Sequence, residues 1–528
     1  MSKPVPFFKA WVPSWLIWVT IVLVLLPGQF ILGLYAGNIN ETAGYYGIEP
    51  ADVQFSLVIY YAALASFFPL EQRFLSYFRG RQYFLLGLLL LTICNVIFYF
   101  TRHPAVFMVV RFFEGIFASG IVGTGMTLLF SRLPSERARA MGYAIFYGML
   151  LAAAPLSLML ASWILINYEF HVLYKVLIYL QVPGAILLLF IMTDVHLKRR
   201  VPLYQIEWVS FVLYCGALCL LGYVLVYGQQ LNWLDDPSIG MSLLVAVLLG
   251  VLFVLRQLRL KRPYIDLRVF RSKNFRIGLL LMVVLYLARG ALGVTSTFLG
   301  GVIGLDPIHI SYLMMANLAG IIVGMTVTSR LILLQKPMRL IWLVGFGLLL
   351  AFHVRMYFLF TSQVDAETFV LPLFLQGLGA GTLMLSIVVF TVSSVPLPIS
   401  FSASATGVAF RFTGFAGSMA LINFFRLYGT SLHYHQLQEE VTQLNPYTAT
   451  RTQQYQQALV HGGMAPDQAS QAASKLLGST VNMQAQLGYN MDYYALISWL
   501  LVVILLVVAL FPYLRRTVVN FRQKPIPY

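Results

Sequence analysis

The sequence predicts an all-α membrane protein with about fourteen membrane-spanning helices, arranged as two bundles of six helices with two extra helices. Three observations lead to this prediction. The 528 residues are 59% hydrophobic and only 10% charged, whereas about a quarter of the residues of a soluble protein are charged. Apolar runs long enough to cross about 30 Å of hydrocarbon recur along the whole chain. Basic residues gather in every second loop between these runs, a pattern typical of membrane topology.

Each predicted span is an apolar run of suitable length, bounded by polar or turn-forming residues. In chain order the predicted spans are residues 15–35, 53–70, 83–100, 105–130, 142–166, 172–193, 207–227, 239–255, 277–299, 309–329, 340–360, 369–391, 403–428 and 493–513. The first run is too long for the apolar core of a cleaved signal peptide, and further spans follow it. We therefore expect it to remain as a span.

Two basic segments divide the chain. The segment 195–208 follows the sixth span, and the basic run 256–276 follows the eighth. A division into six spans, two spans and six spans fits the transporter architectures in which two bundles face each other. The expected units are an N-terminal bundle in residues 1–194, linkers with two extra spans in residues 195–276, and a C-terminal bundle in residues 277–528.

The distribution of charge predicts how the chain is oriented. The basic loops and the basic tail from Arg515 to Lys524 lie on one side, whereas "NWLDDPS" and "SQVDAET" lie on the other. The positive-inside rule then places both termini in the cytoplasm of a plasma membrane, such as the bacterial inner membrane. The polar residues 429–491 are external and are expected to form a helical hairpin, with a turn at 461–463. Topology accounts for the net charge of +16, so we exclude nucleic acid as a partner.

A pair of opposite charges interrupts the fourth span. Arg111 and Glu114 are three residues apart, so they share one face of a helix. A charge at the bilayer centre costs about 2.5–3.5 kcal/mol on insertion scales. The pair can be a self-neutralised ion pair that only orients the helix, or it can be a proton-coupling site in which Glu114 takes the proton. Other carboxylates near spans are expected at span ends: Glu71, Asp194, Glu207 and Asp492.

Further polar residues within spans are candidates for a substrate cavity. Arg289 and Arg411 belong to the second bundle, at a depth where a cation favours anionic or zwitterionic cargo, although backbone carbonyls could also satisfy it. Aromatic and amide side chains could line the same cavity or could simply pack between helices. These candidates are Tyr60, Tyr61, Tyr147 and Gln376.

The sequence gives no indication of an enzyme, a metal site or a cofactor. The three cysteines, Cys94, Cys215 and Cys219, all lie within predicted spans and are interpreted as small apolar residues. His433 and His435 have no third ligand at a useful spacing. We also find no phosphate-binding loop and no hydrolase motif.

Several stretches resemble the drug/proton antiporter branch of the major facilitator superfamily, which has fourteen spans. They include "RFLSYFRGRQ" after the second span, "VVRFFEGIFASG" in the fourth and "RPYIDLRVFRSKNFR" after the extra pair. The resemblance assigns a conformational role to residues in the loop after the second span, in the fourth span and at the proline of the fifth. These residues are Arg79, Gly80, Arg81, Gly115 and Pro155.

The resemblance implies a secondary active transporter that exports amphipathic small molecules by alternating access. Protons would be the coupling ion, and the implied partners are the lipid bilayer, a periplasmic adaptor and an outer-membrane channel. One position departs from the branch, because the carboxylate of its first span falls at about Gly28 in this chain and no acid occurs in that span. The alternatives are a transporter-shaped receptor or scaffold, and a carrier that imports or exports an anionic metabolite.

Overall fold

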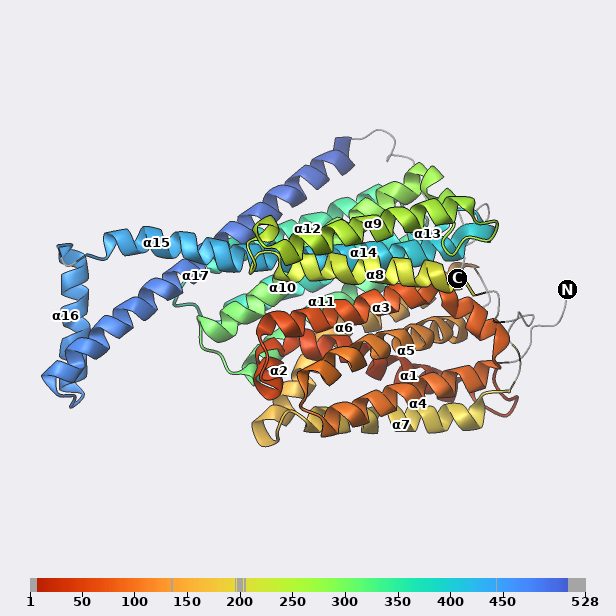
Figure 1. Cartoon of the computed structure of the whole chain (residues 1–528), viewed down its shortest axis with the longest axis horizontal. Helices are drawn as coiled ribbons and strands as arrows, with labels where there is room; N and C mark the ends of the chain where they lie inside the picture. Colours follow the sequence, from red (N-terminus) through yellow and green to blue (C-terminus); the bar gives the residue numbers. More distant parts are fainter. Residues whose placement is uncertain are drawn as a thin grey trace.

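The structure, a computed structural model, is a body of long helices from which a helical arm projects at one end (Figure 1). It describes residues 7–133, 136–194, 196, 203, 206–442 and 444–510, with the backbone alone for 136–139. Within these residues, fourteen helices are long and apolar enough to cross a membrane, which confirms the predicted number. The basic residues 198–200 and the tail 515–524 lie outside the described part of the chain.

The first bundle is built from the first six spans. Its helices are α1 (Ser14–Gly37), α3 (Pro50–Tyr77), α4 (Gly80–Phe100), α5 (Pro104–Ser131), α6 (Glu136–Asn167) and α7 (Val172–Ile191), with the short α2 (Ile39–Tyr46) between the first two. The second bundle contains α10 (Lys273–Gly301), α11 (Pro307–Leu333), α12 (Met338–Leu359), α13 (Val370–Ser393), α14 (Ser400–Phe424) and α17 (Pro466–Leu510). Short turns at helix ends are η2 (Trp233–Asp235), η3 (Leu267–Arg271), η4 (Ala366–Phe369) and η5 (Leu397–Ile399).

Proline sets the start of several spans. Pro50, Pro104, Pro237 and Pro307 each occupy the first turn of a helix. The first turn has no intrahelical partner for its N–H groups, so proline loses nothing there and its fixed φ favours the helix. At one of these starts the side chain of Asp236 also accepts a hydrogen bond from the Ser238 N–H at 2.7 Å. The sequence therefore marks these helix starts locally.

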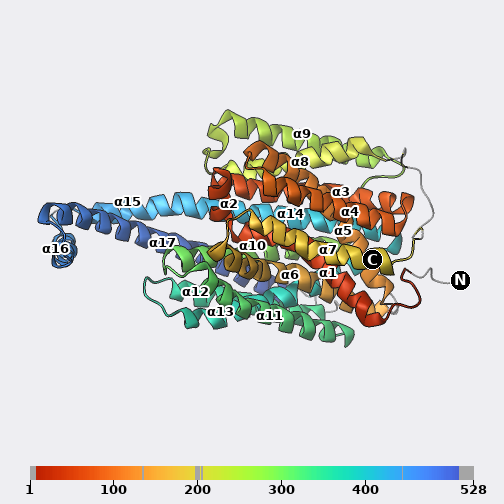
Figure 2. The ribbon, with the colours of Figure 1, turned by 90° about the horizontal axis from the view of Figure 1, so that it is seen from below.

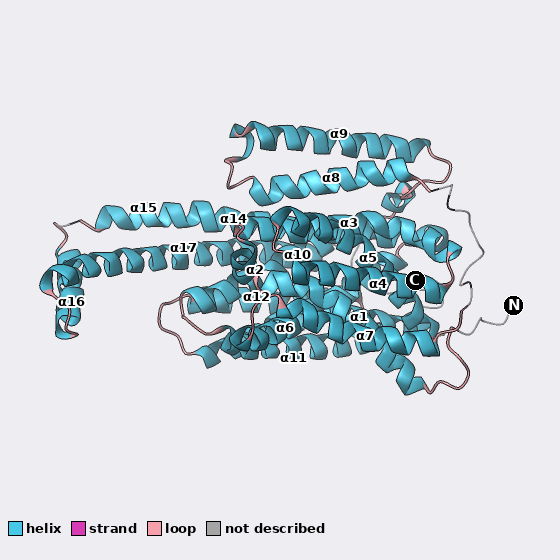
Figure 3. Ribbon diagram, turned by 60° about the horizontal axis from the view of Figure 1, so that its bottom comes forward, coloured by secondary structure: helices cyan, strands magenta, loops and turns pink. Residues whose placement is uncertain are grey.

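The extra pair of spans covers one side of the junction between the bundles. Helix α8 (Trp208–Tyr227) packs against α3 of the first bundle and α14 of the second. Helix α9 (Pro237–Arg259) packs on α8 and lies on the outside (Figures 2 and 3). Only 17% of the most apolar stretch of α9 is buried in the protein. Its remaining surface is suited to lipid.

The arm is continuous with two of the spans. Helix α14 passes through the π-helical turn η6 (Phe425–Gly429) into α15 (Thr430–Glu440), and α16 (Pro446–His461) connects it to α17. The 45 residues of α17 correspond to roughly 67 Å of helix, more than twice the hydrocarbon thickness. The segment 429–491 therefore extends the last two spans, and α16 packs on α17 across the turn at 461–463. The turn at 461–463 uses Gly463, whose φ of +92° suits glycine.

We call the end of the body from which the arm projects the arm end. We call the opposite end, where α3 finishes at Tyr77 and α4 begins at Gly80, the basic end (Figure 1).

Candidate functional site

A cavity of about 230 Å³ lies between the two bundles. It is lined by α1, α3, α5 and α6 of the first bundle and by α10, α13 and α14 of the second. Its lining residues run from Ala36, the second-last residue of α1, and Tyr60 of α3 to Glu71 and Phe130 near the basic end. The cavity therefore occupies the middle of the body and extends toward the basic end.

Most of the predicted cavity residues lie in this one place. The structure brings together residues from α3, α6, α10 and α14 that are far apart in the sequence. The candidates that line the cavity are Tyr60, Tyr61, Tyr147, Arg289 and Arg411.

The prediction for Gln376 is corrected, because this residue is not among those that line the cavity. It is buried within the second bundle, where Asn317 of α11 donates a hydrogen bond to its side-chain oxygen. Helices α11 and α13 approach each other closely here, since a Cβ at Gly377 would lie 2.0 Å from the Asn317 carbonyl oxygen. Gln376 thus joins two helices of the same bundle.

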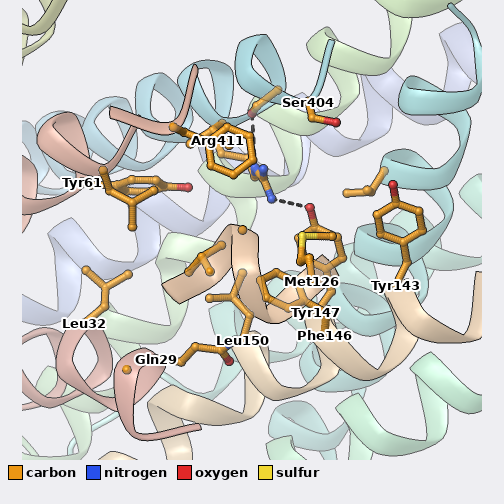
Figure 4. Close-up of a pocket in the computed structure, with 18 of the residues that line it drawn as sticks. Gln29, Leu32, Tyr61, Met126, Tyr143, Phe146, Tyr147, Leu150, Ser404 and Arg411 are labelled. Atoms are coloured by element: carbon orange, nitrogen blue, oxygen red, sulfur yellow. Dashed lines mark hydrogen bonds between the residues drawn. The ribbon is translucent and has the colours of Figure 1, made fainter. Parts of the chain in front are cut away.

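Arg411 joins the two bundles across the cavity (Figure 4). Its Nη1 donates a hydrogen bond to the hydroxyl of Tyr147 at 2.7 Å, and its Nε donates to the Gly407 carbonyl at 3.2 Å. The guanidinium also lies 5.3 Å from the centre of the Tyr147 ring. Arg411 is only 9% exposed, so these contacts replace most of its water.

Arg289 lies on the same side of the cavity, 5.7 Å from the ring centre of Tyr286. Among the described residues that line the cavity, the only carboxylate is Glu71. The middle of the cavity therefore carries two cations from the second bundle, surrounded by aromatic rings.

Arg111 and Glu114 form a fully buried ion pair in α5. An Arg111 Nη1–H group donates to Glu114, and the guanidinium lies 4.3 Å from the Tyr35 ring centre and 4.5 Å from that of Tyr60. Neither member of the pair lines the cavity, but Tyr60 does. Tyr60 thus connects the two places, because it lines the cavity and its ring also lies beside Arg111.

Not every polar atom of this pair has a partner. Oε1 of Glu114 and Nε and Nη2 of Arg111 make no hydrogen bond to the described residues, although they are buried. Buried groups of this kind cost free energy unless a change of state or a ligand satisfies them.

The residues of the predicted conformational motif lie at the basic end and along α5 and α6. Arg79 and Arg81 approach Asp194 at 2.7 and 3.6 Å, and Asp194 follows α7 of the same bundle. These ion pairs therefore tie loops within the first bundle. Gly80 is the buried first residue of α4, and Pro155 lies inside α6, directly after the cavity-lining Ala153 and Ala154.

The arm end of the junction is closed by direct contacts between the bundles. Asn423 of α14 donates to the Gln54 side chain of α3 at 2.7 Å. Ser162 of α6 donates to the Pro307 carbonyl at the start of α11 at 3.1 Å. These two contacts hold the bundles together toward the arm, whereas the cavity lining extends to Glu71 and Phe130 at the basic end.

Glu71 is a cavity residue that the sequence analysis placed at a span end. Helix α3 continues to Tyr77, so Glu71 lies inside it, is 3% exposed and lines the cavity near the basic end. The predicted span ended too early, at residue 70, because hydropathy counts the next residues as polar; Glu71 and Gln72 face the cavity and not lipid. Glu114 is therefore not the only buried carboxylate of the spans.

Other lining residues also went unpredicted, among them Gly28, Gln29, Tyr286 and Ser404. A signal existed for two of them: Tyr286 precedes Arg289 by three residues and Ser404 precedes Arg411 by seven, so each shares a helix face with its arginine. Gln29 is buried, and neither atom of its amide is hydrogen-bonded within the described chain.

The chain is similar to known transport proteins. The family model described as Major Facilitator Superfamily matches residues 15–421. The "Colistin resistance protein EmrB" of Acinetobacter baumannii is 24% identical over 474 residues, with 84% of this chain and 87% of that protein covered. The "Multidrug export protein EmrB" of Escherichia coli is 23% identical over 352 residues, with 64% and 65% covered. Among solved structures, a POT family transporter in complex with 5-aminolevulinic acid matches with a TM-score of 0.63 at 14% identity, covering 97% of this chain and 99% of that one. That likeness concerns the fold.

Proposed function

The chain belongs to the Major Facilitator Superfamily, and from this membership we propose that it is a secondary active transporter that exports amphipathic small molecules by alternating access, driven by protons. Two of its bacterial relatives are named as a colistin resistance protein and a multidrug export protein, which supports the direction and the cargo. The observation that carries the proposal is the cavity between the bundles, which combines a polar middle with many aromatic residues. Toward the arm the bundles are hydrogen-bonded to each other. A bacterial inner membrane is the location that fits these relatives.

Alternating access requires that the contacts at one end of the cavity can break while contacts form at the other. At the arm end the junction is crossed by the hydrogen bonds of Asn423 and Ser162, each of which contributes about 1 kcal/mol. Rocking of the bundles would open this end at modest cost. With the basic end in the cytoplasm, the present state would receive cargo from the cytoplasm.

Tyr60 supports a coupling role for the neighbouring ion pair. Tyr60 lines the cavity and also lies beside Arg111, so cargo in the cavity would contact this residue. Displacement of that ring would remove one of the two rings that hold the Arg111 guanidinium beside Glu114. A buried carboxylate whose cation moves away is costly unless it is neutralised, so Glu114 is the group that would take the proton.

Transport by purified protein in liposomes tests the coupling role. Glu114→Gln keeps the shape and hydrogen-bonding capacity of the side chain but cannot titrate. We expect it to lose accumulation of an amphipathic fluorescent dye driven by an imposed pH gradient, while dye–dye exchange without a gradient survives. Glu169→Gln, at an acid whose side chain is 69% exposed, is the matched control and should accumulate dye normally. Dye accumulation by well-folded Glu114→Gln protein would contradict the coupling role.

The same measurement separates the alternatives. A receptor or scaffold would bind the dye without any flux, in every variant. A carrier for an anionic metabolite would move small hydrophilic anions and would not accumulate the amphipathic dye. We propose that the arm binds a periplasmic adaptor, and that the adaptor connects to an outer-membrane channel. The reason is that the tip of the arm exposes the side chains of Leu444 and Tyr447.

A further inference from the structure

We propose that the cavity is selective for amphipathic molecules with an anionic group, such as a carboxylate or sulfonate, and that Arg411 binds this group with Arg289 beside it. The inference rests on the proposed function only in taking this cavity as the cargo site. It concerns which chemical class enters the site, not whether transport is coupled.

The first argument is the unbalanced charge at mid-depth. Arg411 is 9% exposed; its guanidinium bonds to Tyr147 and to the Gly407 carbonyl, and it forms no ion pair with a carboxylate among the residues that the structure describes. A cation in the middle of a membrane protein is costly and usually has a paired anion. In α5 the protein supplies that anion, because Arg111 is paired with Glu114. The contrast between these two arginines indicates that the counter-ion of Arg411 comes from the cargo.

Glu71 lies too far away to serve as this counter-ion. Tyr61 of α3 lies beside Arg411, and Glu71 follows Tyr61 by ten residues on the same helix. Ten residues of α-helix rise about 15 Å. Glu71 also lies against α5, since the Cβ position of Gly123 nearly coincides with its carboxylate. Its charge therefore belongs to the basic end of the cavity.

The second argument is the geometry around the guanidinium. Its hydrogen bond to the Tyr147 hydroxyl is directed across the cavity (Figure 4). An anionic oxygen is a stronger acceptor than a phenol, so it would displace Tyr147, whose hydroxyl could then donate to the same anion. Arginine suits this role because its planar fork matches a carboxylate. Anion binding would also break a hydrogen bond that joins the two bundles across the cavity.

The rest of the lining fits the body of such a molecule. Leu32, Met126, Phe146 and Leu150 also line the cavity, and Leu32 and Leu150 lie farthest from the arginine in Figure 4. The unpartnered amide of Gln29 lies among them and offers a neutral polar contact. One end of the site is thus cationic and the other is apolar, which selects an amphipathic acid.

The third argument is Gly28 in α1, which also lines the cavity. A Cβ there would meet no atom within 4 Å, so a side chain at this position would enter open space. An acid at this position could neutralise the positive charge of the cavity, but the residue there is glycine, which has no side chain. This gives a means of altering the charge of the site without disturbing its packing.

The first experiment compares probes that differ only in their head group. Binding of naphthylbutyrate, its primary amide and naphthylbutyl-trimethylammonium to the purified full-length protein in lipid nanodiscs is measured by calorimetry. Charge-assisted hydrogen bonds predict that the acid binds about tenfold or more tightly than the amide. Arg411→Gln should abolish that preference, and Arg411→Lys should restore part of it, since lysine keeps the charge but not the fork. An unchanged preference in Arg411→Gln would overturn the proposal.

The second experiment does not require removal of any existing contact. Gly28→Asp places a carboxylate in the cavity, and Gly28→Asn is its uncharged match in size and shape. The aspartate variant should lose affinity for the acid and gain affinity for the ammonium probe, each by about tenfold relative to the asparagine variant. Equal acid-to-ammonium ratios in the two variants would contradict the inference. Because no gradient is involved, a failure of proton-driven export would leave this result intact, and a failure here would leave coupled export of other cargo possible.

Discussion

Gly115 of α5 lies directly against the backbone of Tyr60 in α3: a Cβ at position 115 would fall 2.2 Å from the Tyr60 carbonyl oxygen. The two helices can approach this closely only because residue 115 has no side chain. The contact also fixes the backbone of Tyr60, a residue that lines the cavity and whose ring centre lies 4.5 Å from the Arg111 guanidinium. The glycine that follows the buried ion pair therefore has a packing reason that the sequence alone did not reveal.

Gly115→Ala should destabilise the protein. The new methyl group must push α3 and α5 apart, and such overpacking costs about 1–3 kcal/mol. We expect a lower thermal unfolding midpoint and a loss of coupled transport, because Tyr60 is displaced together with its backbone. Gly250→Ala in α9 is the control, since its Cβ would meet nothing and alanine favours a helix by up to about 1 kcal/mol. Equal midpoints for Gly115→Ala and the unmodified protein would show that the helices can separate freely.

The ion pairs of Arg79 and Arg81 with Asp194 lead to a second prediction. Their side chains are partly exposed, Arg79 by 50%, so the pairs contribute at most about 1 kcal/mol to stability. Replacing both arginines by alanine should leave the unfolding midpoint nearly unchanged but slow transport, if this loop rearranges between states. Asp194→Asn should then slow transport to the same extent. Normal transport in both variants would limit these residues to a topological role.

The sequence predicts the spans well because hydropathy reports directly on them. It also predicts that Arg289 and Arg411 line the cavity, since a charge within an apolar run needs a protein environment. The sequence does not predict which residues line the cavity where this depends on how a helix is rotated about its axis. Gln376 and Tyr147 are both polar residues of buried helices, yet one faces α11 and the other faces the cavity. It fails also for Glu71, because hydropathy cannot distinguish a polar helix end in water from one that lines a cavity.

The orientation of the chain gives a third prediction. In a background without the native cysteines, a cysteine at Gln453 in α16 should react with a membrane-impermeant thiol reagent added to intact cells. A cysteine at Lys261, which is exposed between α9 and η3 at the basic end, should react only after the cells are opened. Both positions are exposed, so accessibility on the folded protein does not differ between them. The opposite pattern of labelling would place the basic end outside and would reverse the direction of export.

Cross-linking across the arm end gives the last prediction. Gln54 and Asn423 are hydrogen-bonded between α3 and α14, which belong to different bundles. If the bundles separate here during transport, cysteines at both positions joined by a short bifunctional thiol reagent should stop transport. If the reagent can be cleaved by a reductant, cleavage should then restore transport.

A matched control pair lies within one bundle, because Asn317 of α11 and Gln376 of α13 are also hydrogen-bonded to each other. Cysteines there should cross-link without effect on transport, since helices of one bundle move together. Undiminished transport after complete cross-linking of Gln54→Cys with Asn423→Cys would mean that the arm end does not open, and alternating access between these bundles would have to be abandoned.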